Sequence, residues 1–125
     1  RDILEFAQGR ITVFGGIMGF ESFVEGAEGW VAVGSNILPS KLAKLFELTV
    51  NDENYHAARE VYREILPIIR LVSGHRYVSG SKAALALIGR SVGCPRPPRL
   101  QLPDSEMPEV RRALALVGLL PKSVI

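Results

Sequence analysis

The side chains that could act in catalysis are few and lie far apart in this chain. Lys82 could form a Schiff base with a carbonyl compound, but it stands in the apolar helical pattern SKAALAL, where helix capping, ion pairing or an interface role is the simpler interpretation. His56 and His75 lack the cysteine or carboxylate neighbours that a metal site needs. The single cysteine, Cys94, is interpreted as a small packing residue. We therefore predict neither a metal nor a cofactor.

A more specific signal comes from two apolar runs that end in glycine. The first, ITVFGG, ends in Gly15 and Gly16, and the second, GAEGWVAVGSN, passes through Trp30 into a polar Gly-Ser-Asn segment. Two such runs joined by a short helical segment predict a βαβ unit with parallel strands. Ligands bind at the carboxyl ends of parallel strands. We therefore predict that Gly15 and Gly16 line a ligand pocket, whereas Trp30, at the start of its strand, is predicted to pack.

The elements around these glycines divide the chain into two parts. Residues 1–50 read as helix, strand, helix, strand, helix, with strands near residues 11–14 and 30–34. Ser35 or Asn36 is predicted to cap the helix that begins at Pro39. Residues 51–125 read as helices only, the first capped by Asp52, with an extended proline-rich linker over residues 94–103. The predicted fold class is α/β with an all-helical C-terminal region.

Composition excludes several classes of function. Fifteen Lys and Arg against thirteen Asp and Glu give a net charge of +2, and no basic stripe of the kind that binds nucleic acid is present. No apolar run approaches the ~20 residues that span a bilayer. A single cysteine is consistent with a reducing compartment, so we expect a cytoplasmic protein. The chain opens with Arg inside a helical pattern, which suggests a fragment.

A parallel sheet of two strands is not expected to be stable alone. Each strand would leave an edge unpaired, and the continuous apolar run WVAV is typical of a strand that is buried on both faces. The sequence therefore calls for further strands, either from a preceding region or from another chain.

In combination these motifs resemble the C-terminal portion of the dihydrodipicolinate synthase / N-acetylneuraminate lyase family. The resemblance covers essentially all 125 residues. It rests on the ordered segments GAEGWVAVGSN-x-x-P, NDENYHAAREVYREILPIIR, SKAALALIG and CPRPPRLQL, followed by a terminal helix that ends in VGL.

The resemblance implies a (β/α)8 barrel, of which this chain would hold the last two strands followed by a helical extension. Family members form a Schiff base between a lysine on the sixth strand and pyruvate or another 2-keto acid, with a tyrosine on the fourth strand as proton relay. Both residues would precede this chain, so no catalytic residue is assigned within it. The family's pocket glycine matches Gly15 or Gly16, and the strand-eight residue whose backbone lines the keto-acid pocket matches Val31.

One departure from the family pattern bears on the substrate. Many members follow the strand-seven glycine with an Asp-Asp pair, where this chain has Ile17 and Met18. The resemblance therefore implies a lyase or aldolase that joins or cleaves pyruvate and an aldehyde, with a sugar-acid aldolase or dehydratase of the same fold as the alternative. A homo-oligomer, a tetramer in the family, is expected. A catalytically inert truncated assembly fragment is the competing hypothesis.

Overall fold

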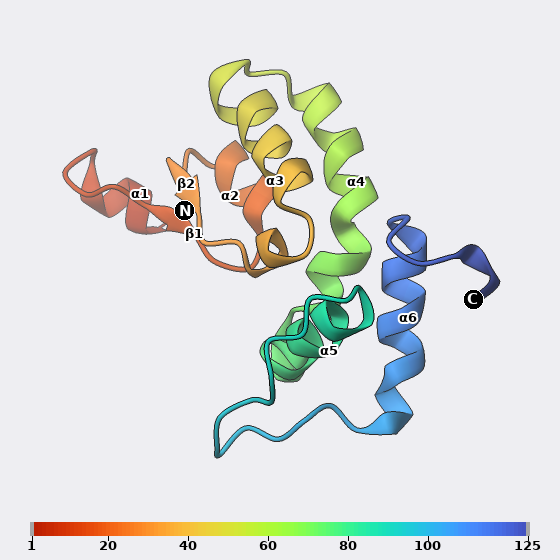
Figure 1. Cartoon of the computed structure of the whole chain (residues 1–125). Helices are drawn as coiled ribbons and strands as arrows, with labels where there is room; N and C mark the ends of the chain where they lie inside the picture. Colours follow the sequence, from red (N-terminus) through yellow and green to blue (C-terminus); the bar gives the residue numbers. More distant parts are fainter. Residues whose placement is uncertain (1, 125) are drawn as a thin grey trace. The chain divides into compact units, whose positions relative to one another are not determined.

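The computed structural model describes residues 2–124, which fall into two compact units. The strand unit comprises residues up to 32 together with residues 40–63, and the helical unit comprises residues 33–39 together with residues from 64 onwards. The long helix α4 (Tyr55–Leu71) contributes residues to both units. Figure 1 shows the elements in chain order. None of the helices in the described range combines the length and apolar character needed to cross a membrane.

The strand unit contains the predicted βαβ arrangement. It begins with α1 (Asp2–Ala7) and continues with β1 (Phe14–Gly15), α2 (Gly19–Val24) and β2 (Gly29–Trp30). The two strands are parallel, with Phe14 opposite Gly29 and Gly15 opposite Trp30. Two adjacent apolar runs connected by a short helix can pair only in this sense, because the helix returns the chain to the same end of the sheet.

Both strands are shorter than the sequence predicts, and each overlaps its predicted range, near residues 11–14 or 30–34, by one residue. Regular pairing covers two residues on each strand, although the backbone N–H of Glu28 also donates to the Val13 carbonyl at 2.9 Å. Residues 33 and 34, expected to end the second strand, instead belong to a 3-10 helix (Val33–Asn36). Apolar β-branched runs indicate extended chain, but a ladder forms only where a second strand lies opposite.

Aromatic side chains form the interior of the strand unit. The ring of Phe23 meets Trp30 edge-on at 6.4 Å between centroids and Phe46 at 5.7 Å. Phe20 stacks on Tyr62 at 5.4 Å. These contacts bring α2, β2, α3 (Pro39–Phe46) and the first turns of α4 around one core, because offset and edge-to-face pairs are the favoured arrangements of aromatic rings.

The caps of two helices differ from the sequence prediction. Neither Ser35 nor Asn36 caps α3, because both lie within the preceding 3-10 helix, where Asn36 Nδ2 donates to the Val33 carbonyl. For α4 the cap is Asn54 and not Asp52: Asn54 Oδ1 accepts from the backbone N–H of Ala57 at 3.1 Å. A π-helical turn (Glu47–Asn51) extends the end of α3, so the chain reaches the start of α4 two residues later than predicted.

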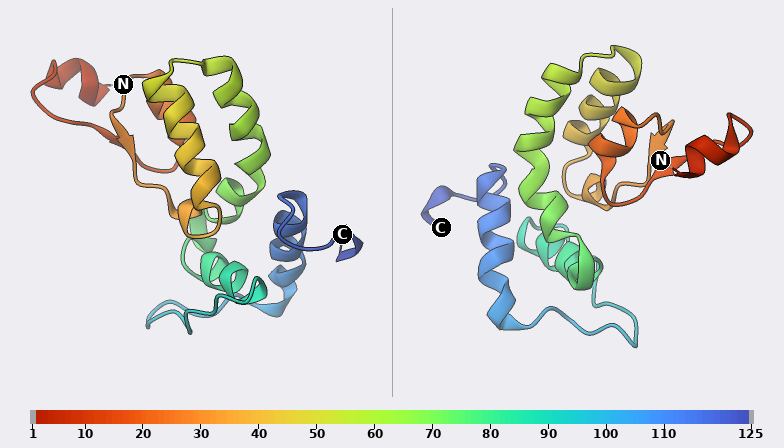
Figure 2. Two further views of the ribbon diagram at one scale, coloured as in Figure 1. Left: turned by 45° about the horizontal axis from the view of Figure 1, so that its top comes forward. Right: turned by 180° about the vertical axis from the view of Figure 1, so that it is seen from behind.

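The helical unit contains α5 (Ser79–Leu87) and α6 (Met107–Leu116), which pack against each other. Its core includes the fully buried Ile65 and Ile68 of α4 and Val110 and Leu114 of α6. Residues 90–103 connect α5 to a short 3-10 helix (Asp104–Glu106) without helix or strand of their own, as predicted for this proline-rich segment. Figure 2 shows this connection as an extended loop in both views.

Candidate functional site

The three residues predicted to line a pocket lie together at one end of the small sheet. Gly15 is the last residue of β1, Gly16 follows it directly, and Val31 follows the last residue of β2. The backbone N–H of Val31 donates to the Gly15 carbonyl at 3.0 Å. The carboxyl ends of both parallel strands therefore coincide, which is the position where ligands bind in α/β folds.

Gly15 must be glycine because α2 passes close behind it. A Cβ at Gly15 would lie 2.6 Å from both Cβ and Oγ of Ser22, which is well inside van der Waals contact. Gly16 differs from Gly15, because a Cβ at Gly16 would meet nothing within 4 Å. The first glycine permits close helix–strand packing, and the second leaves an open surface beside the strand ends.

The loop between β1 and α2, residues 16–18, is fixed at both of its ends. The indole Nε1 of Trp30 donates a hydrogen bond to the carbonyl of Gly16. The carbonyl of Met18 accepts from the backbone N–H of Ser22 at 3.0 Å and from the Ser22 hydroxyl. These contacts use two of the loop's carbonyl groups and restrict its backbone.

Trp30 has a larger part in this arrangement than the packing role predicted for it. Besides its hydrogen bond to Gly16, its ring lies against Gly19, where a Cβ would come within 2.2 Å of the indole carbons. Sequence reasoning did not link Trp30 to the loop. The available signal was Gly19 itself, a glycine inside the opening turn of a helix, where it is unfavourable unless a close contact requires it.

The strand ends carry no group that could act as an acid, base or nucleophile. Residues 14–20 and 29–32 contain no titratable side chain. Within residues 2–124, no group of three His, Cys, Asp or Glu side chains is placed to hold a metal ion. What the site offers chemically is backbone, a glycine surface and apolar side chains, which can bind and orient a substrate whose reaction is catalysed by other groups.

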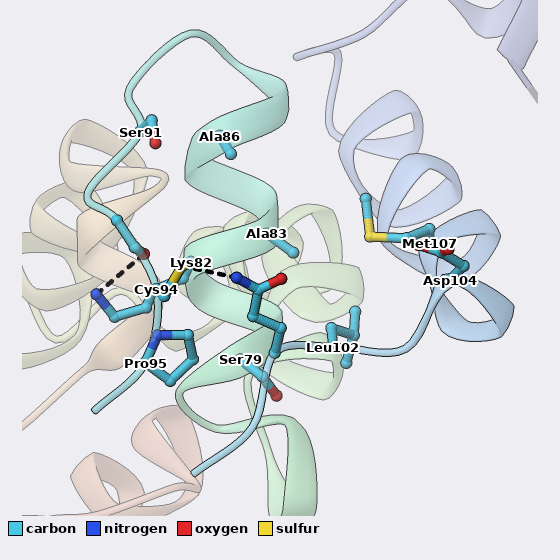
Figure 3. A pocket seen from close by; sticks show the side chains of 12 residues that line it. Ser79, Lys82, Ala83, Ala86, Ser91, Cys94, Pro95, Leu102, Asp104 and Met107 are labelled. Atoms are coloured by element: carbon cyan, nitrogen blue, oxygen red, sulfur yellow. Dashed lines mark hydrogen bonds between the residues drawn. The ribbon is translucent and has the colours of Figure 1, made fainter. Parts of the chain in front are cut away.

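The side chain of Lys82 bonds to the backbone of the loop that follows its helix. Lys82 Nζ donates to the backbone carbonyl of Val92 at 3.0 Å and lies 3.4 Å from that of Gly93, so it holds the start of the 90–103 loop. Lys82 lies at the wall of an open hollow of about 340 Å³, which Cys94 also lines (Figure 3). The amide Nε2 of Gln101 donates to the sulfur of Cys94, which joins the two arms of the loop. Lys82 therefore anchors this loop, a contact that differs from the predicted helix capping and ion pairing.

A cluster of ionic contacts joins two distant segments of the helical unit. The guanidinium of Arg76 donates to carboxylate oxygens of Glu106 and Glu109, and His75 Nε2 lies 3.1 Å from Glu106 Oε2. The hydrogen bonds to Glu106 and Glu109 raise the pKa of Arg76. The hydrogen bond from Arg76, followed by that from His75, lowers the pKa of Glu106 below its ordinary 4.5. This cluster fixes the start of α6 and was not predicted from sequence.

Comparison with known proteins places this geometry in context. The model of the dihydrodipicolinate synthetase family matches residues 2–116. The chain is 30% identical to the 4-hydroxy-tetrahydrodipicolinate synthase of Methanopyrus kandleri over 97 residues, which are 78% of this chain and 32% of that protein. It is 32% identical over 95 residues to the protein of the same name from Corynebacterium diphtheriae, covering 76% of this chain and 31% of that protein.

Solved structures give the same result for the fold. A dihydrodipicolinate synthase structure superimposes with a TM-score of 0.84 at 21% identity, over 92% of this chain and 40% of that one. A monomeric dihydrodipicolinate synthase variant superimposes with a TM-score of 0.79 at 25% identity, over 95% of this chain and 40% of that one. The chain thus spans about a third of the length of the curated relatives that it matches.

Proposed function

Because the chain belongs to the dihydrodipicolinate synthetase family, we propose that it is the C-terminal part of a Schiff-base lyase built as a (β/α)8 barrel. In this proposal residues 1–50 supply the last two βα units of the barrel, and residues 51–125 form a helical region beyond it. The observation that supports this proposal best is the parallel pair β1 and β2, whose carboxyl ends bring Gly15, Gly16 and Val31 together. In barrels this end of the strands holds the active site.

The proposed reaction is the addition of pyruvate, or a related 2-keto acid, to an aldehyde, or the reverse cleavage. A lysine that precedes these residues in the barrel would condense with the keto acid, and the resulting iminium would act as an electron sink that makes the neighbouring carbon acidic. A tyrosine, also outside these residues, would relay the protons. This chain alone would therefore be inactive.

The part proposed for these residues is to shape the keto-acid pocket. Gly16 offers a surface without a side chain, where a planar keto acid can approach the backbone. The N–H of Val31 is used in the sheet, so we propose that its backbone carbonyl is the group that faces the keto acid. Holding the reactants in place is worth several orders of magnitude in rate when the geometry is fixed.

The exposed apolar side chains of the strand unit support completion of the barrel by further strands. Phe14 in β1 is more than half exposed, as is Ile11 just before the strand. Unpaired strand edges with apolar side chains favour pairing with more chain. We also propose a homo-oligomer, a tetramer as in the family, for the complete protein in the cytoplasm.

A sugar-acid aldolase or dehydratase of the same family is the second candidate. The observation that favours it is the presence of Ile17 and Met18 where many family members have two aspartates. A catalytically inert assembly fragment is the third candidate, and it applies if no longer protein contains these residues.

Borohydride trapping with pyruvate tests the proposal on the natural protein that contains these residues. A family lyase should gain the mass of one reduced pyruvyl group for each chain, located on a lysine outside residues 1–125. The Lys82→Arg variant is the matched control and should be trapped equally well, because Lys82 serves the 90–103 loop. Loss of trapping in that variant, or no trapping in the unmodified protein, contradicts the proposal.

A further inference from the structure

The loop between β1 and α2 presents apolar side chains from a fixed backbone. The indole of Trp30 holds the Gly16 carbonyl on one side, and Ser22 holds the Met18 carbonyl on the other. Between these two points, Ile17 is 57% exposed and Met18 is 52% exposed. Large apolar side chains that are exposed on a restrained loop at the ligand-binding end of strands favour contact with a ligand, because a fixed loop loses little conformational entropy on binding.

The neighbouring strand end has the same chemical character. Val31, which follows β2 and is bonded to Gly15, is 69% exposed. No side chain from residue 14 to residue 20, or from residue 29 to residue 32, carries a charge. A ligand that reaches these strand ends therefore meets apolar carbon and backbone from this chain, and no side chain here could pair with an ammonium or carboxylate group.

We propose that Ile17 and Met18 select an aldehyde whose far end is uncharged and apolar. This inference rests on the proposed function. In the reaction, the bound keto acid loses a methyl proton to become an enamine, and its carbon forms a bond to the aldehyde carbon. The enamine electron pair forms this bond and leaves an iminium, while the aldehyde π electrons pass to the aldehyde oxygen, which takes up a proton. Water then hydrolyses the iminium, which releases the product and the lysine. The rest of the aldehyde then lies against Ile17 and Met18, where a charged group would lose water without gaining a partner from residues 14–20 or 29–32.

Two four-carbon aldehydes provide a matched probe on the natural protein that contains these residues. Butanal and succinic semialdehyde have the same chain length, but only the second carries a carboxylate. We expect kcat/KM with pyruvate to favour butanal at least tenfold. The Ile17→Asp variant should lower kcat/KM for butanal about tenfold while leaving pyruvate trapping by borohydride unchanged. Ile17→Val should restore most of the activity, because it keeps the apolar surface.

Val24→Asp is the matched control, since Val24 is 55% exposed and lies at the end of α2. This variant should leave kcat/KM unchanged for both aldehydes. Equal use of the two aldehydes, or a preference for succinic semialdehyde, overturns the inference while trapping still supports the lyase. If Ile17→Asp abolishes trapping and lowers the melting temperature, Ile17 is buried by the rest of the protein, which also overturns it. Failure of trapping in the unmodified protein contradicts the proposed function itself.

Discussion

Single residues at the strand ends are constrained by what passes close to them. Gly15 and Gly19 both lie where a Cβ would overlap a neighbour, in one case Ser22 and in the other Trp30. Gly16, between them in sequence, has free space around it. Gly15 and Gly19 therefore allow close packing, whereas Gly16 borders open space. Substitutions can distinguish these two situations.

Gly19→Ala should destabilise the protein by about 1–3 kcal/mol, the usual cost of forcing extra volume into a packed site. The new Cβ would fall 2.2 Å from the indole of Trp30 and would displace the ring that holds the Gly16 carbonyl. Denaturant unfolding of the natural protein that contains these residues measures the loss of stability, and its tryptophan fluorescence in the folded state reports the displacement of the Trp30 ring. Gly16→Ala is the control and should leave the free energy of unfolding unchanged; equal effects of the two substitutions would contradict the packing argument.

The pair Arg76 and Glu106 predicts a dependence of stability on pH. The pKa of Glu106 is lowered in the folded protein, chiefly by its hydrogen bond from Arg76 and then by that from His75. A lowered folded-state pKa contributes stability that is fully present above the unfolded value and is lost as pH falls through the folded value. Stability from this pair should therefore be complete above about pH 5 and decline below pH 4.5, the ordinary value of the group.

Melting temperatures measured from pH 7 to pH 3 test this dependence. The Glu106→Gln variant should be less stable than the unmodified protein at pH 7, and the difference between them should shrink below pH 4.5, the ordinary pKa of the group. Glu28→Gln serves as control, because Glu28 lies in the turn before β2, outside this ionic cluster. A constant difference across the whole range would show that the pair does not titrate as described.

At the scale of elements, the start of α4 depends on Asn54. Its side-chain oxygen accepts from the N–H of Ala57, while its carbonyl accepts the first helical bond, from Ala58 at 2.9 Å. Asn54→Ala should cost about 1 kcal/mol, as loss of an N-cap does. Asp52→Ala, at the cap position that the sequence predicts, should cost much less. Denaturant unfolding of the two variants decides between them, and a larger effect at Asp52 would contradict the cap assignment.

The elements also show which features of the fold can be predicted from sequence patterns. The helix α3 starts at Pro39, as proline predicts, and α2 ends before Gly26, whose φ of +98° suits glycine. These signals are local, since each depends on the backbone preference of one residue. The strands were misplaced because pairing depends on a second segment, which no local pattern specifies.

At the scale of the whole molecule, residues 1–125 leave much apolar surface uncovered. Phe6 is 80% exposed, and Ile3, Ile11 and Phe14 are each more than half exposed. A two-stranded parallel sheet also lacks the neighbours that stabilise such sheets. Expressed by themselves, these residues should associate or unfold without a sharp transition. Light scattering with size-exclusion chromatography and thermal unfolding measure this, and a cooperatively unfolding monomer would contradict it.

Most helices, the parallel βαβ order and the family could be predicted from the sequence, because these depend on local preferences and on the order of motifs. It also identified Gly15, Gly16 and Val31, which the structure brings to one end of the sheet. Their role in binding a keto acid stays a prediction. The length of the strands, the bond from Trp30 to Gly16 and the contacts of Arg76 with two glutamates could not be predicted from the sequence and are seen only in the folded chain. These join residues 14 to 33 positions apart, and such contacts follow from packing, which periodicity along the chain does not encode.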